Sequence, residues 1–314
     1  MLASIGVNFS KGDKEKSQDA AKQQPSRPRQ NVPAKVEATS RRISTDSESE
    51  FRPIRTRYIS NAIAIPDSFL TSAPVAPVTL RHVPFASSEI PEYAGCLAVS
   101  LDNVLSPEEC QQLLTLAEAS VPMEDGVESP WRPALLNIGV GWEMVATDVR
   151  NNDRIIWDEQ TVVDRLWQRC LNAEGLKDLM SRTPKDNQGL SGRWVFERVN
   201  NRMRFLKYTP GQYFKPHCDG AYHCANDDGK ECQTHYTLHL YLNDSAKESA
   251  LGNGHLGGAT SFLSHDERRR LDINPKAGSV LIFQHKGLYH EGETVVSGTK
   301  YTMRTDILYR WESN

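Results

Sequence analysis

The chain has 314 residues, of which 38% are hydrophobic and 25% charged, and its formal net charge at pH 7 is −3. This near-neutral balance gives no general footprint for nucleic-acid binding, and no apolar run is long enough to span a bilayer. Six scattered cysteines and the lack of an apolar secretory leader favour reduced thiols in a cytoplasmic or nuclear setting. We expect one domain of about 220–250 residues and a tail.

The N-terminal part of the chain differs in composition from the rest. Residues 1–60 are rich in Ser, Gln, Lys, Arg and Pro and carry 12 basic and 7 acidic side chains. With few apolar residues to bury, this segment is expected to be a disordered basic tail. Residues 61–93 contain five prolines and are interpreted as a linker or extended strap. The folded domain is then expected to occupy residues 94–314.

Two helices are expected at the start of this domain. Ser106 has the properties of an N-cap, a proline follows at the first helical position, and Glu109 can close a capping box. A second helix is expected after Asp158 as its N-cap, with apolar residues at helical spacing. Between the two helices, residues 135–145 indicate a strand and residues 150–154 a polar turn.

The C-terminal part alternates apolar and polar residues with the period of two that strands require. The alternating segments are residues 194–199, 203–208, 234–243, 279–283 and 300–309. Helices followed by many strands favour an α+β arrangement, in which the helices back a β sandwich or barrel.

A His-x-Asp pair stands out among these strands. His217 and Asp219 are separated by one residue on an expected strand, so both side chains point to the same side and can converge on a metal ion. His290, near the end of an apolar run, is the candidate third ligand. Two histidines and one carboxylate are the donor set of non-haem Fe(II) oxygenases, and they leave three coordination positions open.

Two cations follow on the last strand. Lys300, ten residues after His290, is expected to share a strand face with Arg304. A cation on this face could neutralise a carboxylate of a bound ligand, which could not otherwise be buried. Strand parity does not choose between the two residues, and arginine often grips a carboxylate bidentately. Tyr208 and Tyr241 are expected to face the barrel interior, either as ligand contacts or as core residues with paired hydroxyls.

Several motifs occur in a fixed order: RFLKYTPGQYFKPHCD (204–219), THYTLHLYLND (234–244), GGATSFL (257–263), PKAGSVLIF (275–283) and HEGETVVSGTKYTMRTDILY (290–309). Together they resemble the motifs of the 2-oxoglutarate- and Fe(II)-dependent dioxygenases, and within them the prolyl 4-hydroxylase-like branch. The resemblance implies a double-stranded β-helix, which is a jelly-roll barrel, backed by the N-terminal helices and carrying the metal at one mouth.

The resemblance also assigns roles to residues. It implies Fe(II) on His217, Asp219 and His290, with 2-oxoglutarate and O2 at the open positions of the metal. It places Tyr208 at the distal carboxylate of 2-oxoglutarate and favours Lys300 over Arg304 as the cation that holds this carboxylate.

The activity that the resemblance implies is hydroxylation of an unactivated C–H bond with release of succinate and CO2, and ascorbate as a reductant. Peptidyl proline is the substrate typical of the branch, and a free amino acid or another small molecule is the alternative. Two other classes are a non-catalytic jelly-roll binding module, which a missing ligand would favour, and a metal-dependent hydrolase, which would have no use for a buried cation.

One further cluster has a metal-ligand composition. His223, Cys224, Cys232 and His235 lie in one short stretch and could hold a structural zinc ion. Their spacing does not match a C-x2-C knuckle. The alternative interpretation is a polar loop beside the mouth of the active site that takes part in substrate selection.

Overall fold

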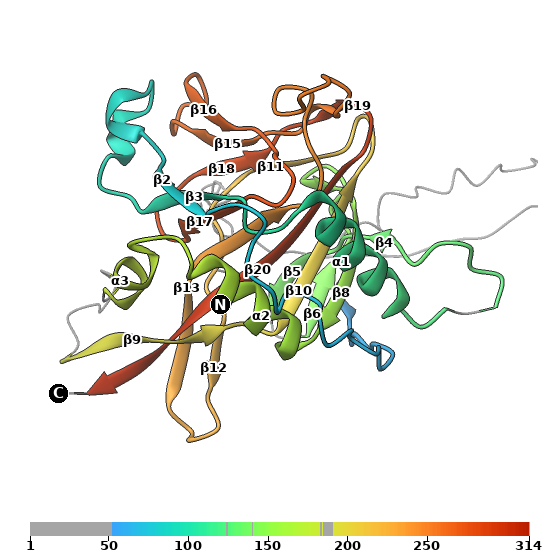
Figure 1. Cartoon of the computed structure of the whole chain (residues 1–314), viewed down its shortest axis with the longest axis horizontal. Helices are drawn as coiled ribbons and strands as arrows, with labels where there is room; N and C mark the ends of the chain where they lie inside the picture. The colour runs from blue at the N-terminus through green and yellow to red at the C-terminus, as the bar shows by residue number, and fades with distance from the viewer. Residues whose placement is uncertain (1–51, 124, 140, 183, 185–190, 314) are drawn as a thin grey trace, which may run out of the picture.

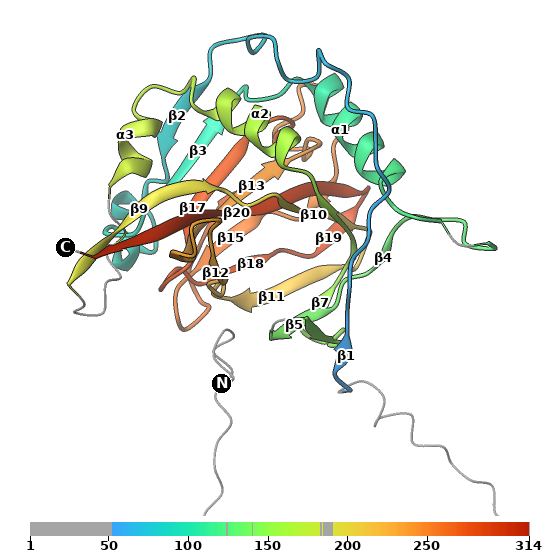
Figure 2. The same ribbon diagram turned by 90° about the horizontal axis from the view of Figure 1, so that it is seen from below.

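The computed structural model describes residues 52–313 except 124, 140, 183 and 185–190. Most of the expected basic tail therefore lies outside the described residues. In the described part, two β-sheets face each other, and helices α1 and α2 cover the outer face of the larger sheet (Figures 1 and 2). This is the α+β jelly-roll arrangement, a double-stranded β-helix, that we expected.

The larger sheet runs in the order β2 (Thr79–His82), β3 (Ala98–Asp102), β17 (Val280–Gln284), β13 (Glu231–Tyr241), β20 (Lys300–Ser313), β10 (Arg202–Tyr208), β8 (Asp153–Asp158) and β4 (Arg132–Pro133). Two further strands join it, β12 (His223–Ala225) beside β13 and β9 (Gly192–Val199) beside β20. The smaller sheet runs in the order β16 (Arg270–Ile273), β15 (Thr260–Leu263), β18 (His290–Gly292), β11 (Tyr213–His217) and β7 (Arg150–Asn151). Neighbouring strands of both sheets are antiparallel.

Two small sheets complete the strands. One is formed by β1 (Ile54–Arg55), β6 (Trp142–Met144) and β5 (Leu136–Gly139), and the other by β14 (Leu256–Gly257) and β19 (Val295–Ser297). The segment expected to be one strand, residues 135–145, is therefore a hairpin. The expected polar turn at residues 150–154 is wrong, because these residues form β7 (Arg150–Asn151) and the start of β8. The buried residues Ile155 and Trp157 hold β8 in the larger sheet between β4 and β10.

Helix α1 (Pro107–Ala119) begins as expected, since the Ser106 hydroxyl accepts from the Glu109 N–H and the Glu109 carboxylate accepts from the Ser106 N–H. Helix α2 (Gln160–Cys170) is capped by Glu159, not by Asp158. Asp158 instead ends β8 and binds the Arg202 guanidinium through two hydrogen bonds of 2.8 and 2.6 Å. The short helix α3 (Leu176–Ser181) was not expected.

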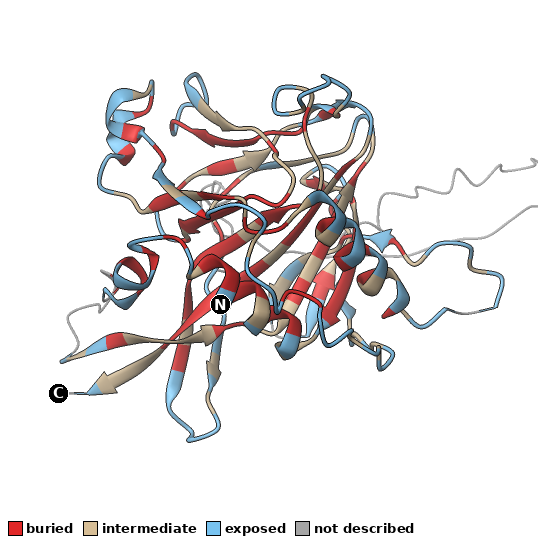
Figure 3. Ribbon diagram, viewed as in Figure 1, coloured by how far each residue is buried: buried red, intermediate tan, exposed pale blue. Residues whose placement is uncertain are grey.

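Alternate side chains of the central strands point to opposite faces, one towards the helices and the other towards the space between the two sheets. On β20, Met303 and Ile307 pack in the core that includes the apolar faces of α1 and α2, and on β13 Leu238 does the same. The intervening residues, such as Arg304 and His239, turn towards the space between the two sheets. Figure 3 shows the buried residues along the middle of these strands. On these two strands the helix-covered face is mainly apolar, whereas the opposite face adds polar side chains to the space between the sheets.

Residues that precede position 94 also pack on the domain. Strand β2 pairs with β3, and Phe85 and Tyr93 belong to an apolar cluster between the sheets. Further towards the N-terminus, the Tyr58 hydroxyl hydrogen-bonds to Glu143, which forms a buried 2.9 Å ion pair with Arg154. The position at which the domain begins remains a prediction.

Candidate active site

The two candidate histidines meet at the ends of neighbouring strands. His217 is the last residue of β11 and His290 the first of β18, and the two are direct partners in the β11–β18 pairing. Asp219 is not on a strand, as the sequence had suggested, but lies two residues beyond the end of β11. One ligand atom from each residue lies within 4.8 Å of the others, and all three residues are buried. Within residues 52–313, outside the gaps, no other group of three His, Cys, Asp or Glu side chains is arranged in this way.

Backbone carbonyls fix the tautomer of each imidazole. The Nδ1 atom of His217 lies 2.8 Å from the Lys215 carbonyl oxygen, and that of His290 lies 3.1 Å from the Leu288 carbonyl oxygen. A carbonyl only accepts, so each Nδ1 carries a hydrogen and Nε2 is the atom left to coordinate a metal. Burial lowers the pKa of His290 to about 3, so this imidazole is neutral at physiological pH.

The Asp219 carboxylate is held on both of its oxygens. Oδ1 accepts from Nη1 of Arg304 at 2.8 Å, and Oδ2 accepts from the Thr237 hydroxyl at 2.5 Å. Burial opposes ionisation of Asp219, but the Arg304 guanidinium together with His290 and His217 outweighs it, and the pKa of this carboxyl lies well below its usual range. The group is therefore an anion in a buried position.

These residues fit an Fe(II) ion. Two imidazole nitrogens and one ionised carboxylate are the donor set that a non-haem Fe(II) site requires. A carboxylate offers about four acceptor positions, so the two protein donors on Asp219 leave positions for a metal.

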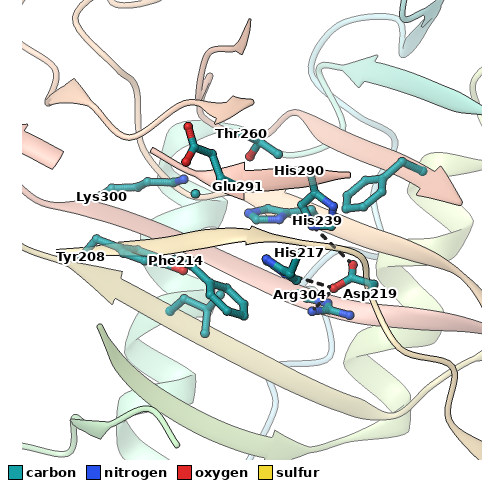
Figure 4. A pocket seen from close by; sticks show the side chains of 13 residues that line it. Tyr208, Phe214, His217, Asp219, His239, Thr260, His290, Glu291, Lys300 and Arg304 are labelled. Atoms are coloured by element: carbon teal, nitrogen blue, oxygen red, sulfur yellow. Dashed lines mark ion pairs between the residues drawn. The ribbon is translucent and has the colours of Figure 1, made fainter. Parts of the chain in front are cut away.

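Lys300 lies at the other end of the same cavity (Figure 4). It is the first residue of β20, is 2% exposed, and pairs across the strands with Tyr208. Its Nζ atom lies 5.2 Å from the centroid of the Tyr208 ring and 5.9 Å from that of Tyr241. Burial lowers the pKa of Lys300 to about 7, and the negative charge of Glu293 offsets this effect only in part. No described residue forms a hydrogen bond or a close ion pair with this ammonium group.

Arg304 occupies the metal end of the cavity instead. It lies four residues further along β20, which is roughly 13 Å from Lys300 along the strand. Besides Asp219, it binds Asp306 at 3.2 Å. The two cations that the sequence placed on one strand face thus lie in different surroundings.

The two tyrosines also differ. Tyr208 is buried and lines the cavity, and its hydroxyl has no hydrogen-bond partner among the described residues. The Tyr241 hydroxyl donates to the Thr260 hydroxyl at 2.8 Å, and it is Thr260 that lines the cavity. His239 also lines the cavity, and burial holds its pKa well below the usual value. Because His239 shares a strand face with Tyr241, alternation could have indicated its position.

The zinc hypothesis is not supported. Cys224 and Cys232 are cross-strand partners on β12 and β13. The ring of His235, however, packs on Trp194 and Tyr309, at centroid distances of 4.9 and 5.4 Å. In the part of the chain that the structure describes, these residues do not gather their ligand atoms around one point.

The arrangement defines a class: a jelly-roll barrel with two histidines and one carboxylate at its mouth and a buried cation behind them. The family model of the 2OG-Fe(II) oxygenase superfamily matches residues 203–305, which contain the three clustered residues and Lys300. The resemblance to this superfamily is thereby confirmed, and the matched region is a 2OG-Fe(II) oxygenase domain. The superfamily implies Fe(II), 2-oxoglutarate and O2 as its cofactor and co-substrates.

Comparison with curated proteins finds no match. Among solved structures, a collagen prolyl hydroxylase of Paramecium bursaria Chlorella virus-1 in complex with 2-oxoglutarate is 21% identical, covers 67% of this chain and 95% of its own, and gives a TM-score of 0.38. A Pseudomonas putida prolyl-4-hydroxylase is 16% identical, with coverages of 69% and 94% and a TM-score of 0.42. A Trichoplax adhaerens prolyl hydroxylase in complex with a hypoxia-inducible-factor peptide is 16% identical, with coverages of 68% and 83% and a TM-score of 0.40. At these values the likeness carries no conclusion about substrate.

None of the helices in the described ranges has the length and apolar character needed to cross a membrane.

Proposed function

We propose that this oxygenase hydroxylates an unactivated C–H bond with 2-oxoglutarate as co-substrate, releasing succinate and CO2. The observation that carries the proposal is Lys300, a buried ammonium group without an anionic protein partner in the same cavity as the His217, Asp219 and His290 cluster. A dicarboxylate with one end at the metal supplies the missing anion at its other end. A hydrolase or a simple metal-binding module would have no use for such a group.

Each protein residue then has a defined task. His217, Asp219 and His290 would hold Fe(II), and their hydrogen bonds to carbonyls, to Thr237 and to Arg304 orient them before the metal arrives. When bound, Fe(II) and 2-oxoglutarate supply the oxidative chemistry. The protein excludes bulk water from the cavity and orients the co-substrate.

We assign the distal carboxylate of 2-oxoglutarate to Lys300 and the Tyr208 hydroxyl. Both groups face the cavity and both lack protein partners, so a carboxylate there gains a charge-assisted hydrogen bond and a neutral one. Arg304 is the weaker candidate, because Nη1 is bound to Asp219 and Nη2 to Asp306. Tyr241 contributes through Thr260, to which its hydroxyl is already bound.

The prime substrate is expected to approach through a second cavity of about 280 Å3. It is lined by Tyr213, Phe214, Lys215, Glu291, Gly292 and Thr294, of which Phe214, Glu291 and Gly292 also line the metal cavity. A side chain of a peptide or a small molecule could therefore reach the metal from this direction. The ordered motifs support peptidyl proline as the substrate, with a free amino acid or another small molecule as the alternative.

The test is turnover of 2-oxoglutarate to succinate by the purified protein with Fe(II) and ascorbate, where ascorbate serves as reductant. Turnover that depends on Fe(II), and that disappears in His290→Ala, is expected. Proline-containing peptides and free amino acids are then compared as stimulants of turnover, with a mass increase of one oxygen atom as the readout. Succinate formation without any dependence on Fe(II) would contradict the proposal.

A further inference from the structure

A row of alternating charges leads away from the metal cluster. Arg304 binds Asp219 at 2.8 Å on one side and Asp306 at 3.2 Å on the other. Asp306 in turn binds Arg204 at 2.9 Å. The two arginines are direct cross-strand partners on β10 and β20, so their charges would repel each other without Asp306 between them. The row therefore holds Arg304 in one place.

Both terminal nitrogens of the Arg304 guanidinium take part in this row. Nη1 donates to Asp219 and Nη2 to Asp306, and Nε is buried without a partner among the described residues. The Asp219 side chain is 2% exposed and that of Arg304 19%, so the carboxylate end of this contact is shielded from bulk water. A cation in such a position stabilises, above all, the negative charge of the carboxylate that it contacts.

We propose that Arg304 is a positioning residue that holds the Asp219 carboxylate for Fe(II) and, through its charge, raises the Fe(III)/Fe(II) reduction potential of the centre. The inference rests on the proposed function, because it requires iron at the His217, Asp219 and His290 cluster. Asp219 is the only anion among the three ligands. A fixed positive charge against it disfavours the more highly charged oxidation state of the metal.

The consequence for the reaction is a centre that stays in the Fe(II) state. Only Fe(II) is competent at the start of each cycle, and a higher potential slows its loss to Fe(III) when no substrate is present. The role differs from that of Lys300, which is proposed to contact the co-substrate itself.

The experiment measures the Fe(III)/Fe(II) potential of the full chain loaded with iron, without co-substrate, by anaerobic potentiometric titration. Arg304→Gln keeps a donor for Asp219 but removes the charge, and Arg304→Lys keeps the charge but loses the planar fork. We expect a lower potential in Arg304→Gln and a potential close to that of the parent protein in Arg304→Lys. Arg204→Gln, the matched control, removes a cation one step further from Asp219 and should shift the potential much less.

A second variant covers the case in which Arg304→Gln does not fold or load iron. Asp306→Asn removes the negative charge that partly neutralises Arg304 and retains an oxygen acceptor, so the potential should rise. A potential that does not change in Arg304→Gln, or that falls in Asp306→Asn, would overturn the inference. Failure of the parent protein to bind iron would instead overturn the proposed function.

The affinity for 2-oxoglutarate supplies an independent readout. Under anaerobic conditions it should change less than about threefold in Arg304→Gln if the contact of this residue is with Asp219. A loss of tenfold or more, which is the size expected for a charge-assisted contact to the co-substrate, would show that Arg304 grips the co-substrate and would overturn its assignment as a positioning residue.

Discussion

The two ends of the cavity differ in whether their charged side chains are paired with other protein groups. At the metal end, Asp219 is paired with Arg304 and Thr237, and Arg304 is paired with Asp306. At the other end, Lys300 faces the rings of Tyr208 and Tyr241, and no carboxylate in the described part of the chain lies within ion-pair distance of it. The metal end is therefore a closed network that fixes geometry before the metal binds, whereas the far end leaves one charge for a ligand to neutralise.

This difference has an energetic basis. A buried ammonium group without a partner is unfavourable, and the protein responds by lowering its pKa, here to about 7 for Lys300. A ligand carboxylate reverses this cost on binding. The unpaired Lys300 therefore lowers the stability of the free protein but increases its affinity for a charged ligand. At the metal end, protein groups alone stabilise the charges.

The largest effect is expected from Asp219→Asn, which breaks the network at the metal end. It retains the shape of the side chain and an acceptor for Arg304 but removes the only ligand charge. We expect metal affinity to fall by about 100-fold or more, since loss of even an outer-shell partner costs 10–100-fold, and turnover to be lost. Metal binding is measured by titration with Mn(II), and thermal unfolding checks the fold. Cys218→Ala, one residue away, is the control and should bind metal normally.

Lys300→Met tests the opposite end. Removal of a charge-assisted contact is expected to raise the Kd for 2-oxoglutarate by about 10–100-fold, on the order of 1.5–3 kcal/mol. The affinity for Mn(II) should not change, because the metal-end network does not include Lys300. Calorimetric titration of the Mn(II)-loaded protein measures both constants. Equal Kd values for the variant and the parent protein would place the carboxylate elsewhere.

The pH dependence of co-substrate binding sharpens the same assignment. The pKa of Lys300 is about 7 in the free protein, and a bound carboxylate favours the protonated form and raises it. Above pH 7 the complex therefore binds more protons than the free protein, so affinity falls as the pH rises. The expected slope is about tenfold in Kd per pH unit between pH 7 and the raised pKa.

Lys300→Arg provides the control for this pH dependence. A guanidinium remains charged across the range, so the Kd of this variant should be nearly flat between pH 7 and 9. A parent protein whose Kd is equally flat would mean that Lys300 does not lose its proton in this range.

The sequence predicted those strands and site residues that can be recognised from strand alternation or from short motifs. Strands β10, β13, β17 and β20 were recognisable from long alternation, and the clustered His217, Asp219 and His290 follow from ordered motifs. Strand β8 was missed because the polar residues before it have the composition of a turn, while pairing with β10 and burial of Ile155 hold it in the sheet.

Contacts between distant strands could not be predicted in this way. Parity placed Lys300 and Arg304 on one face, as the structure shows, but gave no preference between them. The choice depends on Asp219, which reaches Arg304 from a loop beyond β11, and on Asp306, which joins it to Arg204 on β10. The Asp219 contact is set by the packing of the two sheets on each other and the Arg204 contact by the pairing of β10 with β20, and no local pattern contains either.

The smallest effects are expected within the Lys300 end itself, where one tyrosine hydroxyl is paired and the other is not. Tyr208→Phe removes a hydroxyl without a protein partner, so we expect the Kd for 2-oxoglutarate to rise about three- to tenfold with little change in stability. Tyr241→Phe removes the donor to Thr260, so the free energy of unfolding should fall by about 0.5–1.5 kcal/mol and the Kd should change less than about twofold. Urea unfolding and calorimetry on both variants measure the two quantities. If the variants exchanged these behaviours, Tyr241 would be the residue that contacts the co-substrate, and the unpaired hydroxyl of Tyr208 would have no part in binding it.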